Sequence, residues 1–339
     1  MNLTIFDIAK KAGVSKSTVS RVLNHTGYVK EETRKIVEEV IAENHYMPSS
    51  IARNLSMKES STIGVLIQEV GNPFFGELLE GITEVLDQNS YSMFLCDTDN
   101  DFEKQSHALE VMKEQRVKGL ILNPTNDFRK AEETNALKKQ LQSIGTPTVL
   151  LDRQLEKAVW DGVYFENYQA AYAATEALIQ AGNKTVGTIH GTLYARHGND
   201  RYEGFLQAME DYQVPVREEY IWDGAFTKKG AYEVTKKAIL ENRIPDALLL
   251  SNNLITMGFL KAISEHGLQV GKDIAVMGID RIDILDIIKF PLSYVDRDVV
   301  GMGRLAAQKL LERIDNPQKP RDITMVPYHL VLNGSEKKC

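Results

Sequence analysis

Short apolar runs alternate with amphipathic runs over most of this 339-residue chain, and this alternation is the feature that most restricts its fold. Residues 62–67 (TIGVLI) form a nearly continuous apolar run, which is typical of a strand buried on both faces of a sheet. Further strands are predicted at 92–96, 119–122, 148–151 and 162–165, with helices at 74–88, 103–115 and 131–144. A second series follows at 186–189, 200–211, 228–242, 247–250, 255–266 and 274–278. The pattern predicts two doubly wound parallel-sheet subdomains with a ligand-binding cleft at the carboxyl ends of their strands.

The first sixty residues differ from this body in charge. They contain nine Lys and Arg against seven Asp and Glu, whereas the whole chain has a net charge of -7. Residues 1–30 contain five basic residues and a single acidic one, Asp7. Because polyanion binding needs clustered Lys and Arg, a basic beginning on an acidic chain indicates two modules with two roles.

The basic module has the pattern of three short helices. Thr4 and Asp7 form a capping pair for a first helix that ends near Gly13, and Ser15 stands where the N-cap of a second helix belongs. That second helix, residues 16–23, has Val19 inward and an outer face of Lys16, Ser17, Ser20 and Arg21. With a third amphipathic helix at 31–44, the pattern predicts a helix-turn-helix unit. A small helical bundle with an ordinary solvated face remains the alternative.

Residues 3–58 closely resemble the DNA-binding headpiece of the lactose-repressor/GalR family. The motifs are TIFDIA at 4–9, AGVS at 12–15, TVSRVLN at 18–24 and PSSIARNL at 48–55. The resemblance implies a headpiece over 1–58, followed by a ligand-binding and dimerisation core over 61–339. It implies DNA contacts by Thr4, Lys16, Ser17, Thr18, Ser20, Arg21, Asn24 and Tyr28. Residues 49–56 would form a hinge helix on DNA, with Leu55 wedged between base pairs in the minor groove.

One position departs from this headpiece pattern. Lys30 stands where the family usually has a serine helix cap, which should weaken that cap by roughly 1 kcal/mol. Glu31 and Glu32, the next two residues, favour the positive end of the helix dipole.

The body also resembles the family core, whose fold is that of periplasmic sugar-binding proteins. The matching motifs are GNPFF at 71–75, KGLIL at 118–122, LDR at 151–153, RYEGF at 201–205, SNN at 251–253 and GID at 278–280. The resemblance implies an effector stacked against Phe75 and Phe226, with polar contacts from Arg201 and Asp280. Further pocket candidates are Asp152, Arg196 and Asn253. The residues alone leave open that the aromatics belong to a core and that Asp280 caps a turn.

Two departures from the family pattern bear on the ligand. The chain has Asn252-Asn253 where the family often has Asn-Asp, and Asp280-Arg281 where it usually has two aspartates. With Arg153, Arg196 and Arg201 nearby, the cleft would be positive, and arginine recognises carboxylate and phosphate well. This predicts an anionic carbohydrate effector, a sugar acid of the 2-keto-3-deoxygluconate type or a sugar phosphate. The alternative is that Arg281 points to solvent or pairs with Asp283.

Catalysis, cofactors and metals find no support in the sequence. The chain contains no phosphate-binding GxxxxGK[ST] loop, no HExxH and no GxSxG motif, so we expect no enzyme and no catalytic residues. Its two cysteines, Cys96 and Cys339, cannot form a four-ligand zinc site or a disulfide framework. No export signal or membrane-length apolar run is present, so we expect a cytoplasmic protein without membrane partners.

The expected function is a repressor of carbohydrate catabolism genes. A homodimer would place two recognition helices on a near-palindromic double-stranded operator, and the absence of a C-terminal heptad run argues against tetramers. Effector binding would change the spacing of the hinge segments, either releasing DNA or promoting its binding. A catabolite-control regulator of the same fold that answers to a phosphorylated partner protein is the alternative. A sugar transport protein or sugar enzyme is a third, weaker alternative.

Overall fold

The computed structural model describes residues 3–23, 26–44, 46, 60–125, 127–155, 157 and 159–338. The chain divides into two compact units, residues 1–60 and residues 61–339.

The described residues of the first unit form the helices α1 (Ile5–Lys11), α2 (Lys16–Leu23) and α3 (Glu31–Glu43). The Thr4 hydroxyl and the Asp7 carboxylate form a reciprocal capping box that starts α1. Lys30 provides no side-chain hydrogen bond to the start of α3, as its side-chain chemistry predicts. The apolar sides of the helices meet in one small core of Ile8, Ala9, Ala12, Val19, Val22 and Val37.

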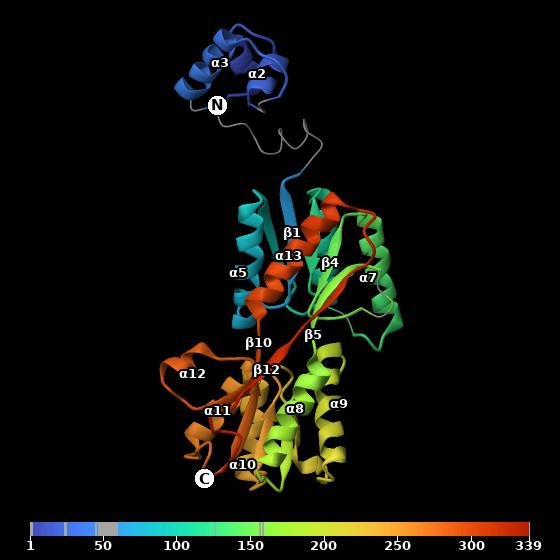
Figure 1. Ribbon diagram of the computed structural model, residues 1–339, viewed down its shortest axis with the longest axis vertical. Helices are drawn as coiled ribbons and strands as arrows, with labels where there is room; N and C mark the ends of the chain where they lie inside the picture. The colour runs from blue at the N-terminus through green and yellow to red at the C-terminus, as the bar shows by residue number, and fades with distance from the viewer. Residues whose placement is uncertain are drawn as a thin grey trace. The chain divides into compact units, whose positions relative to one another are not determined.

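The second unit contains two six-stranded sheets, which confirms the predicted fold of two parallel-sheet subdomains. The first sheet has the order β11-β5-β4-β3-β1-β2 and is parallel throughout. Its strands are β1 (Thr62–Ile67), β2 (Ser92–Asp97), β3 (Gly119–Leu122), β4 (Thr148–Leu151), β5 (Asp161–Phe165) and β11 (Ile323–Val326). On one face lie α5 (Pro73–Gln88) and α13 (Val299–Asp315), and on the other α6 (Phe102–Glu114) and α7 (Ala131–Ile144) (Figure 1). These elements form the first subdomain.

The second sheet has the order β12-β10-β9-β8-β6-β7, and only its pairing of β10 with β12 is antiparallel. Its strands are β6 (Val186–His190), β7 (Ile221–Asp223), β8 (Ala247–Leu250), β9 (Ala275–Ile279), β10 (Ser293–Arg297) and β12 (Tyr328–Val331). The helices of this second subdomain are α8 (Asn167–Gln180), α9 (Arg196–Asp211), α10 (Lys228–Leu240), α11 (Asn253–Glu265) and the short α12 (Asp283–Ile287), with a 3₁₀ turn at Glu218–Tyr220.

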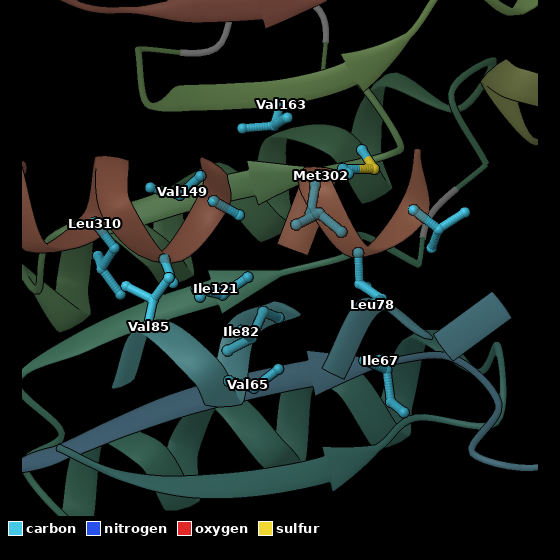
Figure 2. Close-up of a cluster of buried hydrophobic side chains, with 14 of the residues drawn as sticks. Val65, Ile67, Leu78, Ile82, Val85, Ile121, Val149, Val163, Met302 and Leu310 are labelled. Carbon is cyan, nitrogen blue, oxygen red and sulfur yellow. The ribbon is translucent and has the colours of Figure 1, made fainter. Parts of the chain in front are cut away.

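The chain passes between the two subdomains three times, after β5, after β10 and after β11. Glycines allow helices on the outer face of the first sheet to pack backbone to backbone. A Cβ on Gly303 of α13 would lie 2.2 Å from the carbonyl oxygen of Leu78 in α5. Ile82 of α5, Met302 of α13 and Val65 of β1 belong to the apolar cluster that the two helices form with the sheet, drawn in Figure 2. The described part of the chain has no helix with the length and apolar character needed to span a membrane.

Candidate functional site

The exposed face of α2 carries the side chains that a DNA-reading helix requires. Lys16, Ser17 and Arg21 are exposed, while Val19 and Val22 face the core. The sequence of α2 contains no acidic residue that would repel phosphate. Tyr28 is 85% exposed in the segment between α2 and α3, an unusual position for a large ring without a partner surface.

Several side chains of this unit are already engaged within it. The Thr4 hydroxyl donates to the Asp7 carboxylate at 2.7 Å, and the Thr18 hydroxyl lies 2.9 Å from that of Ser15. The ammonium of Lys16 lies 4.7 Å from the ring centre of Phe6. The predicted contacts Asn24 and Leu55, and the predicted hinge helix at 49–56, lie outside the described residues.

The second unit contains a cavity of about 320 Å³ between its two subdomains. Many of its polar residues come from the loops that follow β1, β2, β4, β8 and β9, the carboxyl ends of parallel strands, where doubly wound folds bind ligands. Six of the seven predicted effector residues line this cavity: Phe75, Asp152, Arg201, Phe226, Asn253 and Asp280. It is also lined by Arg153, which was expected near the cleft, and by residues that the prediction did not assign to the site, among them Asn72, His197 and Arg297.

Arg201 is buried in the wall of the cavity, with 3% of its surface exposed. Its Nε donates to the Asn167 side-chain oxygen at 2.9 Å, and one terminal nitrogen donates to the carbonyl oxygen of Ser251 at 2.6 Å. Burial and the nearby charge of Arg297 lower the pKa of Arg201 to about 10, so the group stays charged at neutral pH. Two uncharged acceptors thus hold its guanidinium in place.

Asp280 follows β9 and pairs with Arg297 at the end of β10. The Nε and one terminal nitrogen of Arg297 both donate to Oδ1 of Asp280, the first at 2.8 Å. The guanidinium of Arg297 also lies 4.3 Å from the ring centre of Phe165 and 5.3 Å from that of Phe74. This buried pair leaves Oδ2 of Asp280 without a hydrogen bond from any described residue.

Phe226 presents a flat aromatic surface to the cavity. Its ring stacks on the His197 imidazole, with ring centres 4.9 Å apart and an angle of 17° between the planes. Gly191 makes room for the ring, since a Cβ there would lie 2.3 Å from its carbon atoms. Burial lowers the pKa of His197 well below its usual value, and the charges of Arg153, Arg201 and Arg297 lower it further, so the imidazole is neutral.

Six of the lining residues hold left-handed backbone conformations that non-glycine residues rarely adopt. These are Asp99 (φ 50°), Asn100 (φ 52°), Asp152 (φ 59°), Ala225 (φ 51°), Phe226 (φ 55°) and Asp280 (φ 80°). Such conformations cost of order 1–3 kcal/mol each and cluster at ligand sites, where the surrounding structure imposes them. Asn253 adds a link between the subdomains, because its side-chain nitrogen donates to the Asn72 side-chain oxygen at 2.9 Å.

Arg196 does not line this cavity, which corrects its assignment to the effector site. His197 and Arg201 lie four residues apart on one face of α9, whereas Arg196 is about 100° around the helix. Its guanidinium lies instead 5.1 Å from the ring centre of Phe128. The four-residue spacing from Arg201 is the signal by which His197 could have been found.

Arg281 does not add charge to the cavity either. It is exposed and bonds to Asp286 at 2.7 Å and to Asp283 at 3.3 Å, the alternative that the sequence left open. The lining residues comprise three arginines and four acidic residues, of which Glu69 and Asp99 are exposed. Of the arginines expected to make the cleft positive, Arg153 and Arg201 therefore line the cavity, and Arg196 and Arg281 do not.

No group of three or more His, Cys, Asp or Glu among the described residues is arranged to hold a metal ion. A helix-turn-helix unit joined to a two-subdomain core with a cavity lined by polar and aromatic side chains defines the class of ligand-responsive DNA-binding regulators. Comparisons with known proteins agree. Residues 4–49 match the profile of bacterial regulatory proteins of the lacI family, and residues 175–335 match a periplasmic binding protein-like domain.

Relatives of known class extend these matches over nearly the whole chain. The HTH-type transcriptional repressor PurR of Pasteurella multocida is 32% identical over 335 residues, and that of Actinobacillus pleuropneumoniae 34% over 334, each alignment covering 98% of both chains. The lac repressor dimer bound to operator and the anti-inducer ONPF superposes with a TM-score of 0.86, at 26% identity over 99% of this chain and 100% of that one. The chain belongs to the lacI family of bacterial regulatory proteins. It is a DNA-binding transcriptional repressor regulated by an effector, and its relatives are transcription factors rather than enzymes.

Proposed function

We propose that this repressor controls carbohydrate catabolism genes in the cytoplasm and that a small carbohydrate is its effector. The observation that carries the proposal is the composition of the cavity wall. Carboxylates of Asp152 and Asp280, the amide of Asn253 and the guanidinium of Arg201 line the same cavity as the ring of Phe226. Sugar hydroxyls both donate and accept hydrogen bonds, so they suit a wall with both carboxylates and guanidiniums, while the C–H face of a sugar packs on an aromatic ring.

Related structures support this effector class. A LacI family transcriptional regulator from Enterococcus faecium with bound ribose has a TM-score of 0.72 and 25% identity, covering 82% of this chain and 99% of that one. The cavity of about 320 Å³ is at the small end of the range for small-molecule sites, which fits a ligand of monosaccharide size.

The PurR relatives favour a second candidate, a purine base as effector. A planar base would stack on Phe226, and the edge of Asn253 could pair with its polar atoms. A base offers few hydrogen-bonding atoms to the five buried charged groups of the wall, Asp152, Arg153, Arg201, Asp280 and Arg297, whereas a sugar offers many hydroxyl groups. This difference is the reason why we favour a carbohydrate.

A phosphorylated partner protein as the signal is the third candidate. The transcription regulator CcpA of Lactococcus lactis shares the fold, with a TM-score of 0.73 and 19% identity. A signal of that kind requires that no metabolite alone changes operator binding, so the titration described below separates it from the first two candidates.

For DNA binding we propose that Lys16 and Ser17 read base edges in the major groove. The neighbouring contacts to bases or phosphates would come from Thr4, Thr18, Ser20, Arg21, Asn24 and Tyr28. The boundaries that we propose are 1–58 for the headpiece and 61–339 for the core. Within the headpiece, 49–56 would be the hinge helix, with Leu55 as the minor-groove wedge.

We further propose that the protein acts as a homodimer on a near-palindromic operator, and that α12 contributes to the contact. Ile284, Ile287 and Ile288 on this short helix are 56%, 73% and 62% exposed, an apolar group that a second copy would cover.

The proposal is tested by selecting a binding site from random duplex DNA with the full-length protein and measuring operator affinity by fluorescence anisotropy. Pentoses, hexoses, sugar acids, hypoxanthine and guanine are then titrated against the complex. A change in operator affinity with a carbohydrate-class ligand supports the proposal. A response to purines alone, or to no metabolite, refutes it in favour of the second or third candidate.

A further inference from the structure

Among the buried side chains that line the cavity, arginines outnumber carboxylates by three to two. Arg153, Arg201 and Arg297 are 8%, 3% and 6% exposed, while the buried acids of the wall are Asp152 and Asp280. The other acidic residues of the wall, Glu69 and Asp99, are exposed to solvent. An uncompensated charge in a buried site is costly, so a ligand that supplies the missing negative charge gains affinity.

Hydrogen bonding identifies the arginines that have capacity left for a ligand. Arg297 gives two of its nitrogens to Asp280, but its other terminal nitrogen is buried without a partner among the described residues. Arg153 gives one terminal nitrogen to the Asn100 side-chain oxygen at 2.9 Å, and its Nε is likewise buried and unpartnered. Arg201 donates hydrogen bonds to the uncharged oxygens of Asn167 and Ser251.

The charges of these three guanidiniums all act on the same side chain, that of His197. The positive charges of Arg153, Arg201 and Arg297 all reach its imidazole and, together with burial, lower its pKa. The neutral ring cannot balance the excess charge, and its Nδ1 is buried without a partner. The guanidinium of Arg201 and the His197 ring both lie beside Phe226, the former 5.9 Å from the ring centre.

We propose that the effector is a sugar acid whose single carboxylate binds beside His197, among Arg153, Arg201 and Arg297. This inference rests on the proposed carbohydrate effector and specifies its chemical class. One carboxylate balances the one excess charge, and planar guanidiniums suit carboxylate oxygens. A phosphate monoester, with a charge of about -1.5 to -2 at neutral pH, would overshoot that balance. Oδ2 of Asp280 and the Asp152 carboxylate can accept hydrogen bonds from the ligand's hydroxyl groups.

Arg196 and Arg281 lie outside the cavity and take no part in this carboxylate site. Arg297 lies at the end of β10, and the parallel pairing of β9 with β10 brings it beside Asp280.

Isothermal titration calorimetry on the full-length protein tests the inference with matched ligand pairs: glucose with gluconate and glucuronate, and galactose with galactonate and galacturonate. Glucose 6-phosphate and hypoxanthine complete the panel. At least one sugar acid should bind ten times or more tightly than its neutral parent and than glucose 6-phosphate. This measurement uses the unaltered protein, so it does not depend on whether a variant folds.

A pair of variants then locates the carboxylate. Arg153→Gln should reduce the preference for the acid over its neutral parent about tenfold. Arg281→Gln, which removes an exposed arginine near but outside the cavity, should leave that preference unchanged. Equal losses in the two variants would show that the preference comes from general charge attraction and would overturn the site.

The outcomes separate this inference from the proposed function. Neutral sugars binding as tightly as their acids, or glucose 6-phosphate binding more tightly, overturn the carboxylate while leaving a carbohydrate effector in place. Binding of hypoxanthine alone, or of neither sugars nor sugar acids at millimolar concentration, overturns both.

Discussion

Replacing Gly191 with alanine should push the ring of Phe226 into the effector cavity. A Cβ at this position would lie 2.3 Å from three ring carbons, whereas carbon atoms in contact are ordinarily about 3.5–4.0 Å apart, so the ring must move by more than about 1 Å. His197 stacks on the ring, and Gly198 already approaches it so closely that a Cβ there would lie 3.0 Å away. The open direction for the movement is the cavity itself.

The size of the effect follows from the cost of overpacking. Inserting one methyl group into a packed site costs about 1–3 kcal/mol. If the displaced ring transfers that cost to ligand binding, effector affinity falls about 5- to 150-fold, at roughly 1.4 kcal/mol per factor of ten. Operator binding without effector should stay within twofold of the unaltered protein, because the DNA-binding unit is untouched.

Calorimetric titration with the effector, alongside operator anisotropy without it, measures both quantities. Gly76→Ala is the matched control: a Cβ there has no neighbour within 4 Å, although Gly76 is adjacent to Phe75 in α5. That variant should bind effector normally and be slightly more stable, by about 0.5–1 kcal/mol, as for other helical glycines. Unchanged effector affinity in Gly191→Ala would show that Phe226 does not contact the ligand.

Three further perturbations test other parts of the molecule. Lys16→Ala should lower operator affinity by about 1–3 kcal/mol in anisotropy titrations at fixed salt, and an equal loss in Lys35→Ala on α3 would contradict base reading by Lys16. Ile287→Asp should convert the dimer to monomers in analytical ultracentrifugation at micromolar concentration, and a persistent dimer would exclude α12 from the contact. Burial and the charges of Asp283 and Asp280 raise the pKa of Glu77 to about 7, so its contribution to stability is present below pH 4.5 and is lost as the pH rises through 7. Glu77→Gln should therefore raise the unfolding temperature more at pH 8 than at pH 5. An equal rise at the two pH values would refute the charge repulsion between Glu77 and these two aspartates.

The alternation of the sequence predicted the two sheets because their central strands are buried on both faces. Residues 62–67 and 119–122 were predicted with the boundaries of β1 and β3, since a continuous apolar run allows little freedom in where a buried strand lies. The edge strands β11 and β12 escaped prediction because half-exposed strands alternate polar with apolar residues and are short. The three crossings between subdomains depend on pairings of residues far apart in the chain, which no local pattern reports.

The cavity was predictable where a residue follows a recognisable strand, and not elsewhere. Asp152 and Asp280 come directly after the apolar strands β4 and β9, so their place at the sheet edge followed from the pattern. Arg297 was missed because β10 (SYVDR) carries polar residues and was not recognised as a strand. Arg281 was placed in the cleft because it is next to Asp280, yet adjacent residues leaving a strand point in different directions, and only Asp280 turns inward.

The polar groups of the cavity wall come from both subdomains, and this explains how a ligand in the cavity can regulate DNA binding. Asp152 and Arg153 belong to the first subdomain, and Arg201 and Asp280 to the second, so a ligand that bonds to all four binds most tightly to one separation of the subdomains. A ligand shifts a conformational equilibrium only by its difference in affinity between the two states, typically about 1–3 kcal/mol of coupling. The chain enters the first subdomain at β1, immediately after the DNA-binding unit, and β1 pairs on both sides within the sheet. A ligand held by one subdomain alone would bind both separations equally well and leave operator affinity unchanged, so the division of the four charged groups between subdomains is the feature on which regulation depends.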